Sequence, residues 1–312
     1  MQEAMIPING VPTHVMTQGC WIEEDLAPGG CKDIVVLITG NPGIPEFYKG
    51  FIKSLKEKLP SETPVWVVGH AGHVQPPKLL HAKPSDIPDK QLYDMKGQYD
   101  HKMQFIKKYV PKDARLHLVG HSIGSWFILN LLRDEEIEQR TVKCYLLFPT
   151  IENMLDTPNG KFYTSIVSWL IPVLLIFTWI FSCFPYILQF YLVRLFGIFY
   201  GIPAKSIKAV LQLLNYTVLN NVFMLANEEL QRVRELDHNV IEKHASKLWF
   251  YYGTRDGWVP VSYYENLKAC HPKVDAVLCK RRFYHSFVLN NDVEMGYIVA
   301  DKINEMIDQS HS

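Results

Sequence analysis

The chain has 312 residues, enough to bury one large domain or one domain that carries an insertion. Its 32 Lys and Arg residues balance its 32 Asp and Glu residues, so the formal net charge is zero. We therefore expect no nucleic-acid partner, because counterion release depends on a concentrated basic face. Hydrophobic residues make up 48% of the chain, and the excess is local rather than general.

Short apolar runs alternate with helical patterns along most of the chain. The first thirty residues resemble an antiparallel hairpin, and later apolar runs bounded by turn residues are typical of buried parallel strands. This alternation predicts an α/β protein with a mostly parallel sheet and helices on both faces. Strands are predicted at residues 34–39, 65–68, 115–119, 142–148, 248–252 and 276–281, and helices at 45–59, 93–109, 122–132, 260–269 and the C-terminus.

A segment of different composition interrupts this rhythm. The pattern predicts a core formed by residues 1–150 and 246–312, with residues 151–245 inserted as a hydrophobic helical cap. Residues 166–193 include no Asp, Glu, Lys or Arg over 28 positions, more than the ~20 apolar residues that cross a bilayer. Pro172 and Pro185 lie inside this run, and each should kink or end a helix. The run is flanked by Lys161, Arg194, Lys205 and Lys208, and a further apolar helix is predicted near residues 207–226.

The motif Gly120-His121-Ser122-Ile123-Gly124 stands between a predicted strand and a predicted helix. G-x-S-x-G in this setting is typical of the nucleophile elbow of α/β hydrolases, where a tight turn exposes the serine hydroxyl. Small residues two before and two after the serine let the backbone bend. The motif predicts Ser122 as a nucleophile, and the alternative is an ordinary glycine-rich turn.

A nucleophilic serine needs a base, and the base needs an acid that orients it. In this fold the order along the chain is serine, acid, histidine. Asp256 follows the strand at 248–252, and His285 follows the strand at 276–281, so we predict these two residues as acid and base. The alternatives are Asp156 or Glu152 as the acid, His271 as the base, and purely structural roles for Asp256 and His285.

An acyl-transfer site also needs hydrogen-bond donors for the developing oxyanion. One donor is predicted to be the backbone N–H of Ile123. The second should come from Thr39-Gly40-Asn41-Pro42-Gly43, which resembles the H-G-x-x-G loop of lipases. Because Pro42 has no N–H, Asn41 is the predicted donor. The alternative is a plain Pro-Gly turn.

No cofactor or metal is predicted. The close histidine pairs His70/His73 and His117/His121 lack the spacing of a metal site, and no G-x-G-x-x-G or P-loop follows a strand. The cysteines, at positions 20, 31, 144, 183, 270 and 279, form no C-x-x-C, which favours an intracellular protein with reduced thiols. Residues 1–7 show no pattern of a signal peptide.

The position of the apolar segment restricts how it can meet a membrane. Ser122 precedes it, whereas Asp256 and His285 follow it, so a single transmembrane span would separate the three side chains. Two full crossings need about 40 apolar residues plus a turn, which residues 162–203 barely supply. The sequence favours a hairpin in one leaflet or in a phospholipid monolayer over a dry cap buried on the active site.

The four motifs G-H-S-I-G, T-G-N-P-G, G-T-R-D-G and Y-H-S-F, together with the apolar insertion, resemble the lipid droplet-associated hydrolases over nearly the whole chain. The resemblance implies an α/β-hydrolase fold and a serine ester hydrolase acting on neutral lipids, sterol esters or acylglycerols. It also implies location at lipid droplets and the endoplasmic reticulum, on the cytosolic face, with contact through residues 162–203. The triad it implies is Ser122, Asp256 and His285. A binding or scaffold protein with weak or vestigial hydrolase activity is the alternative.

Overall fold

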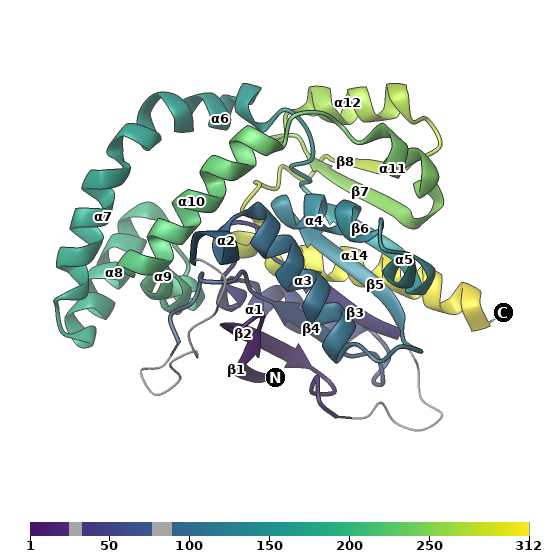
Figure 1. The fold of residues 1–312 in the computed structure, drawn as a ribbon, viewed down its shortest axis with the longest axis horizontal. Helices are drawn as coiled ribbons and strands as arrows, with labels where there is room; N and C mark the ends of the chain where they lie inside the picture. The colour runs from purple at the N-terminus through teal and green to yellow at the C-terminus, as the bar shows by residue number, and fades with distance from the viewer. Residues whose placement is uncertain (25–32, 77–88, 312) are drawn as a thin grey trace.

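The computed structural model describes residues 1–24, 33–76 and 89–311, so Cys31 lies outside the described residues. Within them, Cys144, Cys183, Cys270 and Cys279 have free thiols. The body of the molecule is an eight-stranded sheet with helices on both faces (Figure 1). The strands are β1 (Gln2–Ile8), β2 (Val11–Gln18), β3 (Asp33–Ile38), β4 (Val65–Val68), β5 (Arg115–His121), β6 (Thr141–Leu147), β7 (Leu248–Gly253) and β8 (Asp275–Cys279).

The strands lie in the order β1-β2-β4-β3-β5-β6-β7-β8. β3 to β8 run parallel to one another, whereas β1 pairs antiparallel with β2 and β2 pairs antiparallel with β4. The predicted α/β class, the mostly parallel sheet and the entry hairpin are confirmed. Strand order changes direction between β3 and β5, and ligands of open α/β sheets bind outside the carboxyl ends of strands at such a point.

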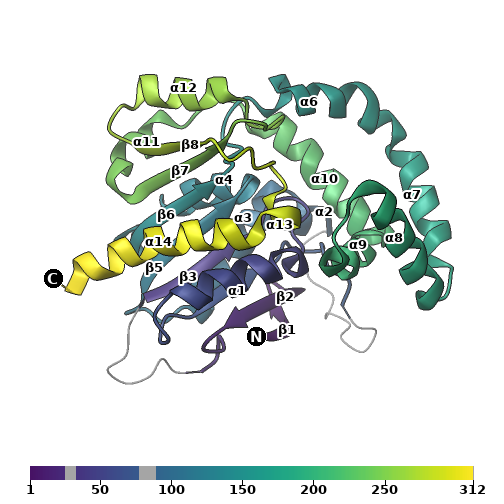
Figure 2. The same cartoon turned by 180° about the vertical axis from the view of Figure 1, so that it is seen from behind.

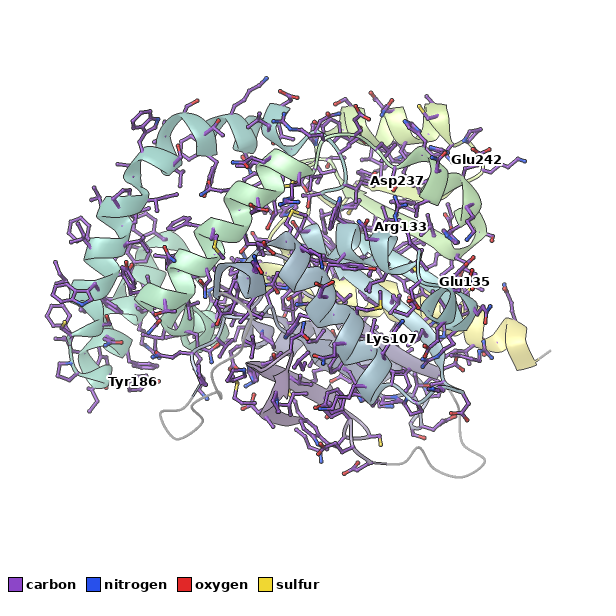
Figure 3. All side chains as sticks on the ribbon, in the orientation of Figure 1. Lys107, Arg133, Glu135, Tyr186, Asp237 and Glu242 are labelled. Carbon is purple, nitrogen blue, oxygen red and sulfur yellow. The ribbon has the colours of Figure 1, made fainter. Side chains whose placement is uncertain are left out.

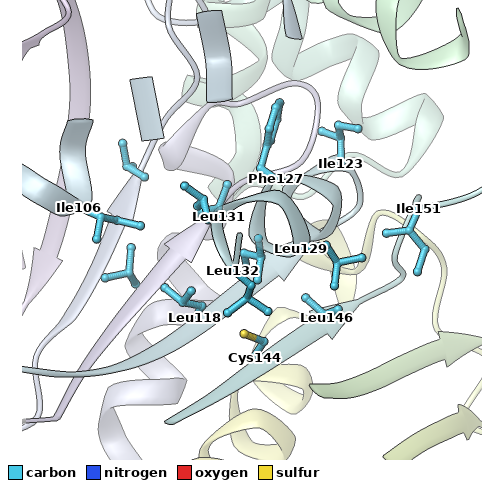
Figure 4. Packing of buried hydrophobic residues seen from close by; sticks show 14 of the residues in the cluster. Ile106, Leu118, Ile123, Phe127, Leu129, Leu131, Leu132, Cys144, Leu146 and Ile151 are labelled. Atoms are coloured by element: carbon cyan, nitrogen blue, oxygen red, sulfur yellow. The ribbon is translucent and has the colours of Figure 1, made fainter. Parts of the chain in front are cut away.

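Alternation along the central strands divides the core into two layers. Val36 and Ile38 of β3 face one layer with α3 (Met95–Tyr109) and α4 (Ile123–Leu131), whereas Val35 and Leu37 face the other with α1 (Lys49–Lys58) and α14 (Asp292–His311). Figure 2 shows α1 and α14 together on one face of the sheet, and Figure 4 shows α4 packed over β5 and β6. The core helices are α1 (Lys49–Lys58), α2 (Asp89–Tyr93), α3 (Met95–Tyr109), α4 (Ile123–Leu131), α5 (Glu135–Arg140), α11 (His238–Lys243), α12 (Val261–Cys270), α13 (Phe287–Asn290) and α14 (Asp292–His311), with short helical turns η1 (Pro45–Tyr48), η2 (Met154–Asp156) and η5 (Ala245–Lys247).

Most predicted helix boundaries in the core lie within one residue of the observed ones, and two helix starts differ by more. The helix predicted to start at residue 93 starts at Met95, because the Asp94 side chain accepts a hydrogen bond from the Gly97 N–H (2.8 Å) and caps it. The helix predicted from Pro45 begins as η1 and becomes α1 only at Lys49. Proline at the first helical position explains the early start, since its missing N–H needs no partner there.

The insertion between β6 and β7 is helical throughout. Figures 1 and 2 show it as an arch beside the sheet, in which a curved helix descends from α6 through α7 and the chain returns through α8, α9 and α10. Its elements are α6 (Pro158–Phe162), the π-helical turn η3 (Tyr163–Val167), α7 (Ser168–Ser182), α8 (Tyr186–Tyr200), η4 (Ala204–Ser206), α9 (Ile207–Leu213) and α10 (Tyr216–Arg232).

The two prolines of the insertion behave differently. Pro185 precedes α8 and separates it from α7, as expected. Pro172 lies inside α7, and the helix Pro158–Ser182 continues through it, so this proline does not end a helix. The preceding π-helical turn and Pro172 account for the curvature of this helix, since both are recognised sources of bends.

The helix predicted near residues 207–226 is broken. α9 ends at Leu213 and α10 begins at Tyr216, with an angle of 86° between the two helical segments. The Asn215 side chain accepts hydrogen bonds from the N–H groups of Thr217 and Val218 and therefore starts a new helix.

Most apolar side chains of α7 and α8 face outward. Trp169 is 79% exposed and Phe199 is 77% exposed, and Figure 3 shows side chains projecting from these helices, with Tyr186 at the far end of the insertion. Among the described residues, one helix, Pro158–Ser182, is long and apolar enough to cross a membrane. α8 has only 15 residues, and at about 1.5 Å per residue it is shorter than the ~30 Å hydrocarbon core.

Candidate active site

Ser122 lies in a sharp turn between β5 and α4. Its backbone angles, φ 53° and ψ −123°, are a sparsely populated combination for a residue with a side chain. The turn depends on its small neighbours, since a Cβ atom on Gly124 would lie 2.3 Å from the Ile38 carbonyl oxygen. The sequence G-x-S-x-G thus allows a conformation that brings the Ser122 hydroxyl to the carboxyl end of β5.

Three side chains that are far apart in the sequence form a hydrogen-bonded chain at this end of the sheet. His285 Nε2 lies 2.9 Å from Ser122 Oγ, and His285 Nδ1 lies 2.7 Å from Asp256 Oδ2. Each is brought there by the loop after a parallel strand: β5 for the serine, β7 for the aspartate and β8 for the histidine. This arrangement can deprotonate a hydroxyl and stabilise the imidazolium that results.

The Asp256 carboxylate is fixed by its own backbone surroundings. Its Oδ1 accepts hydrogen bonds from the N–H groups of Trp258 (2.8 Å) and Val259 (3.0 Å), which leaves Oδ2 for His285. The Asp256 side chain is fully buried, whereas that of His285 is 17% exposed. The Asp256 carboxylate is therefore shielded from water, while the His285 imidazole remains accessible from the cavity.

The alternative acids and base have other surroundings. Glu152 accepts a hydrogen bond from Asn266 (3.1 Å), and burial raises its pKa to about 7. Asp156 is exposed in η2. His271 Nε2 lies 2.8 Å from His238 Nδ1. The geometry therefore favours Asp256 and His285 for the triad.

The predicted oxyanion donors lie after the adjacent parallel strands β3 and β5. In the loop after β3, the Gly40 N–H donates to the Tyr48 hydroxyl (2.8 Å) and the Gly43 N–H donates to His73 Nδ1 (2.9 Å). The backbone N–H groups of Asn41 and Ile123 have no hydrogen-bond partner within the described part of the chain. They therefore remain available to an oxyanion, which keeps the prediction of both donors open.

The Asn41 side chain has a separate role, which sequence reasoning missed. Its Nδ2 donates to Glu229 Oε1 and to the Val222 carbonyl, both at 3.0 Å, so it ties the loop after β3 to α10 of the insertion. Glu229 is 3% exposed, and burial raises its pKa to about 8. The sequence does contain a signal for this contact. Glu229 continues the helical spacing of the apolar residues Val218, Val222 and Leu225, so its side chain is expected to be buried.

A cavity of about 620 Å³ opens next to His285. Core loops and the insertion both line it, so the insertion forms part of the cavity wall. Most of the lining residues are apolar, and Arg255 beside Asp256 is exposed at the cavity. The lining includes Asn41, Tyr48, His121 and His285 from the core, and Ile202, Val210 and Leu213 from the insertion.

The close histidine pairs hold no metal-like arrangement. His117 bonds with Asp33 (2.8 Å) and Tyr145 (3.2 Å), and His121 bonds with Tyr48 and the His285 backbone. The rings of His70 and His73 pack edge to face. In the parts of the chain that the structure describes, no group of three or more His, Cys, Asp or Glu residues is placed to hold a metal ion.

Comparison with known proteins agrees with this architecture. Residues 31–288 match the family model described as lipid-droplet associated hydrolase. A lipid droplet-associated hydrolase of Drosophila melanogaster is 43% identical over 310 residues, covering 98% of this chain and 99% of the relative. The lipid droplet-associated hydrolase of Homo sapiens is 34% identical, covering 98% and 95% of the two chains.

Solved structures show the fold. An epoxide hydrolase from Bacillus megaterium matches with a TM-score of 0.62 at 14% identity, covering 96% of this chain and all of the other. A thermophilic esterase from Thermogutta terrifontis matches with a TM-score of 0.58 at 14% identity over the full length of both chains. The predicted α/β-hydrolase fold is confirmed, and the chain belongs to the family of lipid droplet-associated hydrolases.

Proposed function

We propose that this protein is a serine ester hydrolase that acts on neutral lipids, sterol esters or acylglycerols, at the surface of lipid droplets and the endoplasmic reticulum. The observation that carries the proposal is the unbroken chain of hydrogen bonds from Ser122 through His285 to Asp256. The names of the relatives support a hydrolase associated with lipid droplets.

The proposed reaction follows from the geometry of the site. His285 Nε2 takes the proton of the Ser122 hydroxyl as Oγ attacks the ester carbonyl, and Asp256 stabilises the imidazolium. The Asn41 and Ile123 N–H groups hold the oxyanion of the tetrahedral intermediate. The imidazolium then protonates the leaving alcohol, and water, activated by the same base, releases the acyl group as a carboxylic acid.

The insertion is proposed to hold the cavity at a lipid surface through residues 162–203. The exposure of α7 and α8 supports this role over a dry cap, because the apolar side chains point away from the core. The hydrogen bonds that join Ser122, His285 and Asp256 support a location of both halves of the core on one side of any membrane, and α8, with 15 residues, is short for a return crossing. A hairpin in one leaflet or in a monolayer fits both facts.

The proposal is tested by labelling with a fluorophosphonate and by turnover of neutral-lipid emulsions. The wild-type protein is expected to form an adduct at Ser122 and to hydrolyse at least one sterol ester or acylglycerol, and Ser122→Ala should abolish both. An intact, droplet-bound protein that forms no adduct would favour the scaffold alternative instead.

The lipid-surface role is tested separately with the substitutions Trp169→Glu and Phe177→Glu, which place charge on the exposed face of α7. We expect loss of binding to phospholipid-coated triacylglycerol droplets with the rate on a short soluble ester unchanged. Undiminished droplet binding would support a dry cap.

A further inference from the structure

A buried chain of hydrogen bonds joins two loops of the site through His121. The Gly40 N–H donates to the Tyr48 hydroxyl (2.8 Å), and this hydroxyl lies 2.7 Å from His121 Nδ1. His121 Nε2 lies 2.9 Å from the carbonyl oxygen of His285. His121 is 6% exposed and Tyr48 is 2% exposed. The chain thus connects the loop after β3, next to Asn41, with the backbone of the proposed base.

Each hydrogen bond in this series has one possible donor and one possible acceptor. A carbonyl oxygen only accepts, so His121 Nε2 must carry a proton. Burial lowers the pKa of His121 to about 3, so the ring is neutral near pH 7 and Nδ1 is an acceptor. The Tyr48 hydroxyl therefore accepts from Gly40 and donates to His121.

Aromatic neighbours fix the orientation of the His121 ring. Its centroid lies 4.9 Å from that of Phe287 and 6.3 Å from that of Phe148, both in edge-to-face contact. The ring therefore has little freedom to leave its two hydrogen bonds. Loss of either bond would leave a buried polar group without a partner.

We propose that His121 and Tyr48 are positioning residues that hold the backbone of His285 and of Gly40 in register with Ser122. They act through the base and through the loop that carries the Asn41 amide, so one clamp aligns proton transfer and oxyanion binding together. This inference rests on the proposed function, because it assigns these residues to the same reaction.

The size of the expected effect follows from how steeply the reaction depends on distance. A misplacement of about 1 Å at a reacting group costs about 100-fold in rate. The His285 imidazole would keep its hydrogen bond to Asp256 after the clamp is lost, so the backbone would shift without full loss of the triad. We therefore expect a partial loss, smaller than that of Ser122→Ala.

The test uses Tyr48→Phe, His121→Phe and the double variant in the full-length protein. Each single substitution keeps an aromatic ring and removes hydrogen bonds. Tyr145→Phe is the matched control, because Tyr145 is also fully buried, its hydroxyl lies 3.2 Å from His117 Nδ1, and neither residue lines the cavity. Thermal unfolding curves give the folded fraction of each variant at the assay temperature.

Three quantities are measured on folded protein: the rate of fluorophosphonate labelling of Ser122, and kcat and KM for a short soluble ester. Both single variants are expected to lose about 10- to 100-fold in labelling and kcat, because the clamp positions reacting groups. KM should stay within about twofold, because each variant keeps an aromatic ring at the cavity wall and loses only the hydrogen bonds of the clamp. The double variant should be about as slow as the slower single variant, because both residues act through one chain. Tyr145→Phe should retain the wild-type rates.

Wild-type rates in Tyr48→Phe and His121→Phe would overturn the inference while Ser122-dependent labelling of the wild type upholds the proposed function. The inference would also be overturned if Tyr145→Phe lost as much rate as Tyr48→Phe and His121→Phe. The same holds if the rate losses of the two single variants multiply in the double variant. A wild type that is not labelled at Ser122 would overturn the proposed function and this inference with it.

Discussion

The central sheet and the insertion are both rich in apolar residues, yet they place them in opposite ways. Every residue of β3 is buried, whereas on α7 Trp169 is 79% exposed and Ile176 is 58% exposed. Apolar composition shows that a segment is driven out of water but does not show what covers it. β3 is covered by the rest of the chain. The outward face of α7 is left to an external apolar phase, which we propose to be lipid.

The largest expected effect distinguishes an acid in the loop after β7, Asp256, from one in the turn η2 after β6, Asp156. Asp256→Asn should lower kcat for a soluble ester by about 10²- to 10⁴-fold, because an amide cannot orient and stabilise the imidazolium as a carboxylate does. Asp156→Asn, at an exposed position in η2, should leave kcat within about twofold. Similar losses in the two variants would contradict the assignment of the acid.

The same substitution on a helix of each region tests the comparison directly. Ile128 on α4 is fully buried, whereas Ile176 on α7 is 58% exposed. Ile128→Asn should lower the free energy of unfolding by about 3–5 kcal/mol, because it leaves a cavity and buries an amide. Ile176→Asn should change it by less than about 0.5 kcal/mol in lipid-free buffer.

Urea denaturation measures both variants. Partition onto droplets provides the second measurement for Ile176→Asn, which should bind more weakly than the wild type. Equal destabilisation of the two variants would show that α7 is covered by protein.

The contact between the two regions should depend on pH. Burial raises the pKa of Glu229 to about 8 in the folded protein, against 4.5 for the free group. The folded state therefore binds more protons than the unfolded state between these values, and the stability from the buried neutral acid is lost as pH rises toward 8. Glu229→Gln keeps an acceptor for Asn41 and does not ionise.

The unfolding free energy of Glu229→Gln relative to the wild type is therefore expected to increase from pH 5 to pH 8. Each pKa unit corresponds to about 1.4 kcal/mol, so the difference at pH 8 should reach a few kcal/mol. Denaturation across this range measures it. A difference that does not vary with pH would show that Glu229 is charged in the folded state.

The smallest effects concern two glycines. A Cβ atom on Gly124 would lie 2.3 Å from the Ile38 carbonyl oxygen, whereas Gly201, at φ +70°, has open space around it. Gly124→Ala should cost about 1–3 kcal/mol through overpacking and should also lower kcat, because the Ser122 turn must move. Gly201→Ala should cost about 1 kcal/mol through backbone strain. Thermal unfolding and a soluble ester assay separate the two effects.

The sequence was a good guide wherever one local pattern determined the structure. The apolar runs at the strands have no alternative to burial between two layers of helices, and the tight turn at Ser122 needs Gly124. The family resemblance is likewise confirmed. The triad residues remain predictions about chemistry, although the fold brings them within hydrogen-bonding distance.

Contacts between distant segments could not be predicted. The hydrogen bond from Asn41 to Glu229 joins residues 188 positions apart. It depends on the direction of α10, which begins at the bend after Asn215. Pro172 lies inside the continuous helix Pro158–Ser182 although proline disfavours a helix interior. In both cases the outcome depends on how segments pack, which local propensity does not specify.

The insertion leaves and rejoins the sheet at neighbouring parallel strands, since Cys144 of β6 pairs with Leu248 of β7. The whole insertion is therefore a single loop that connects two adjacent strands. The free-energy cost of closing such a loop grows by only about 0.6 kcal/mol for each doubling of its length. The outer part of the insertion, formed by α7 and α8, can therefore be lengthened, shortened or exchanged at little thermodynamic cost. Such an attachment point allows the length of the insertion to change without any change to the strands that carry Ser122, Asp256 and His285.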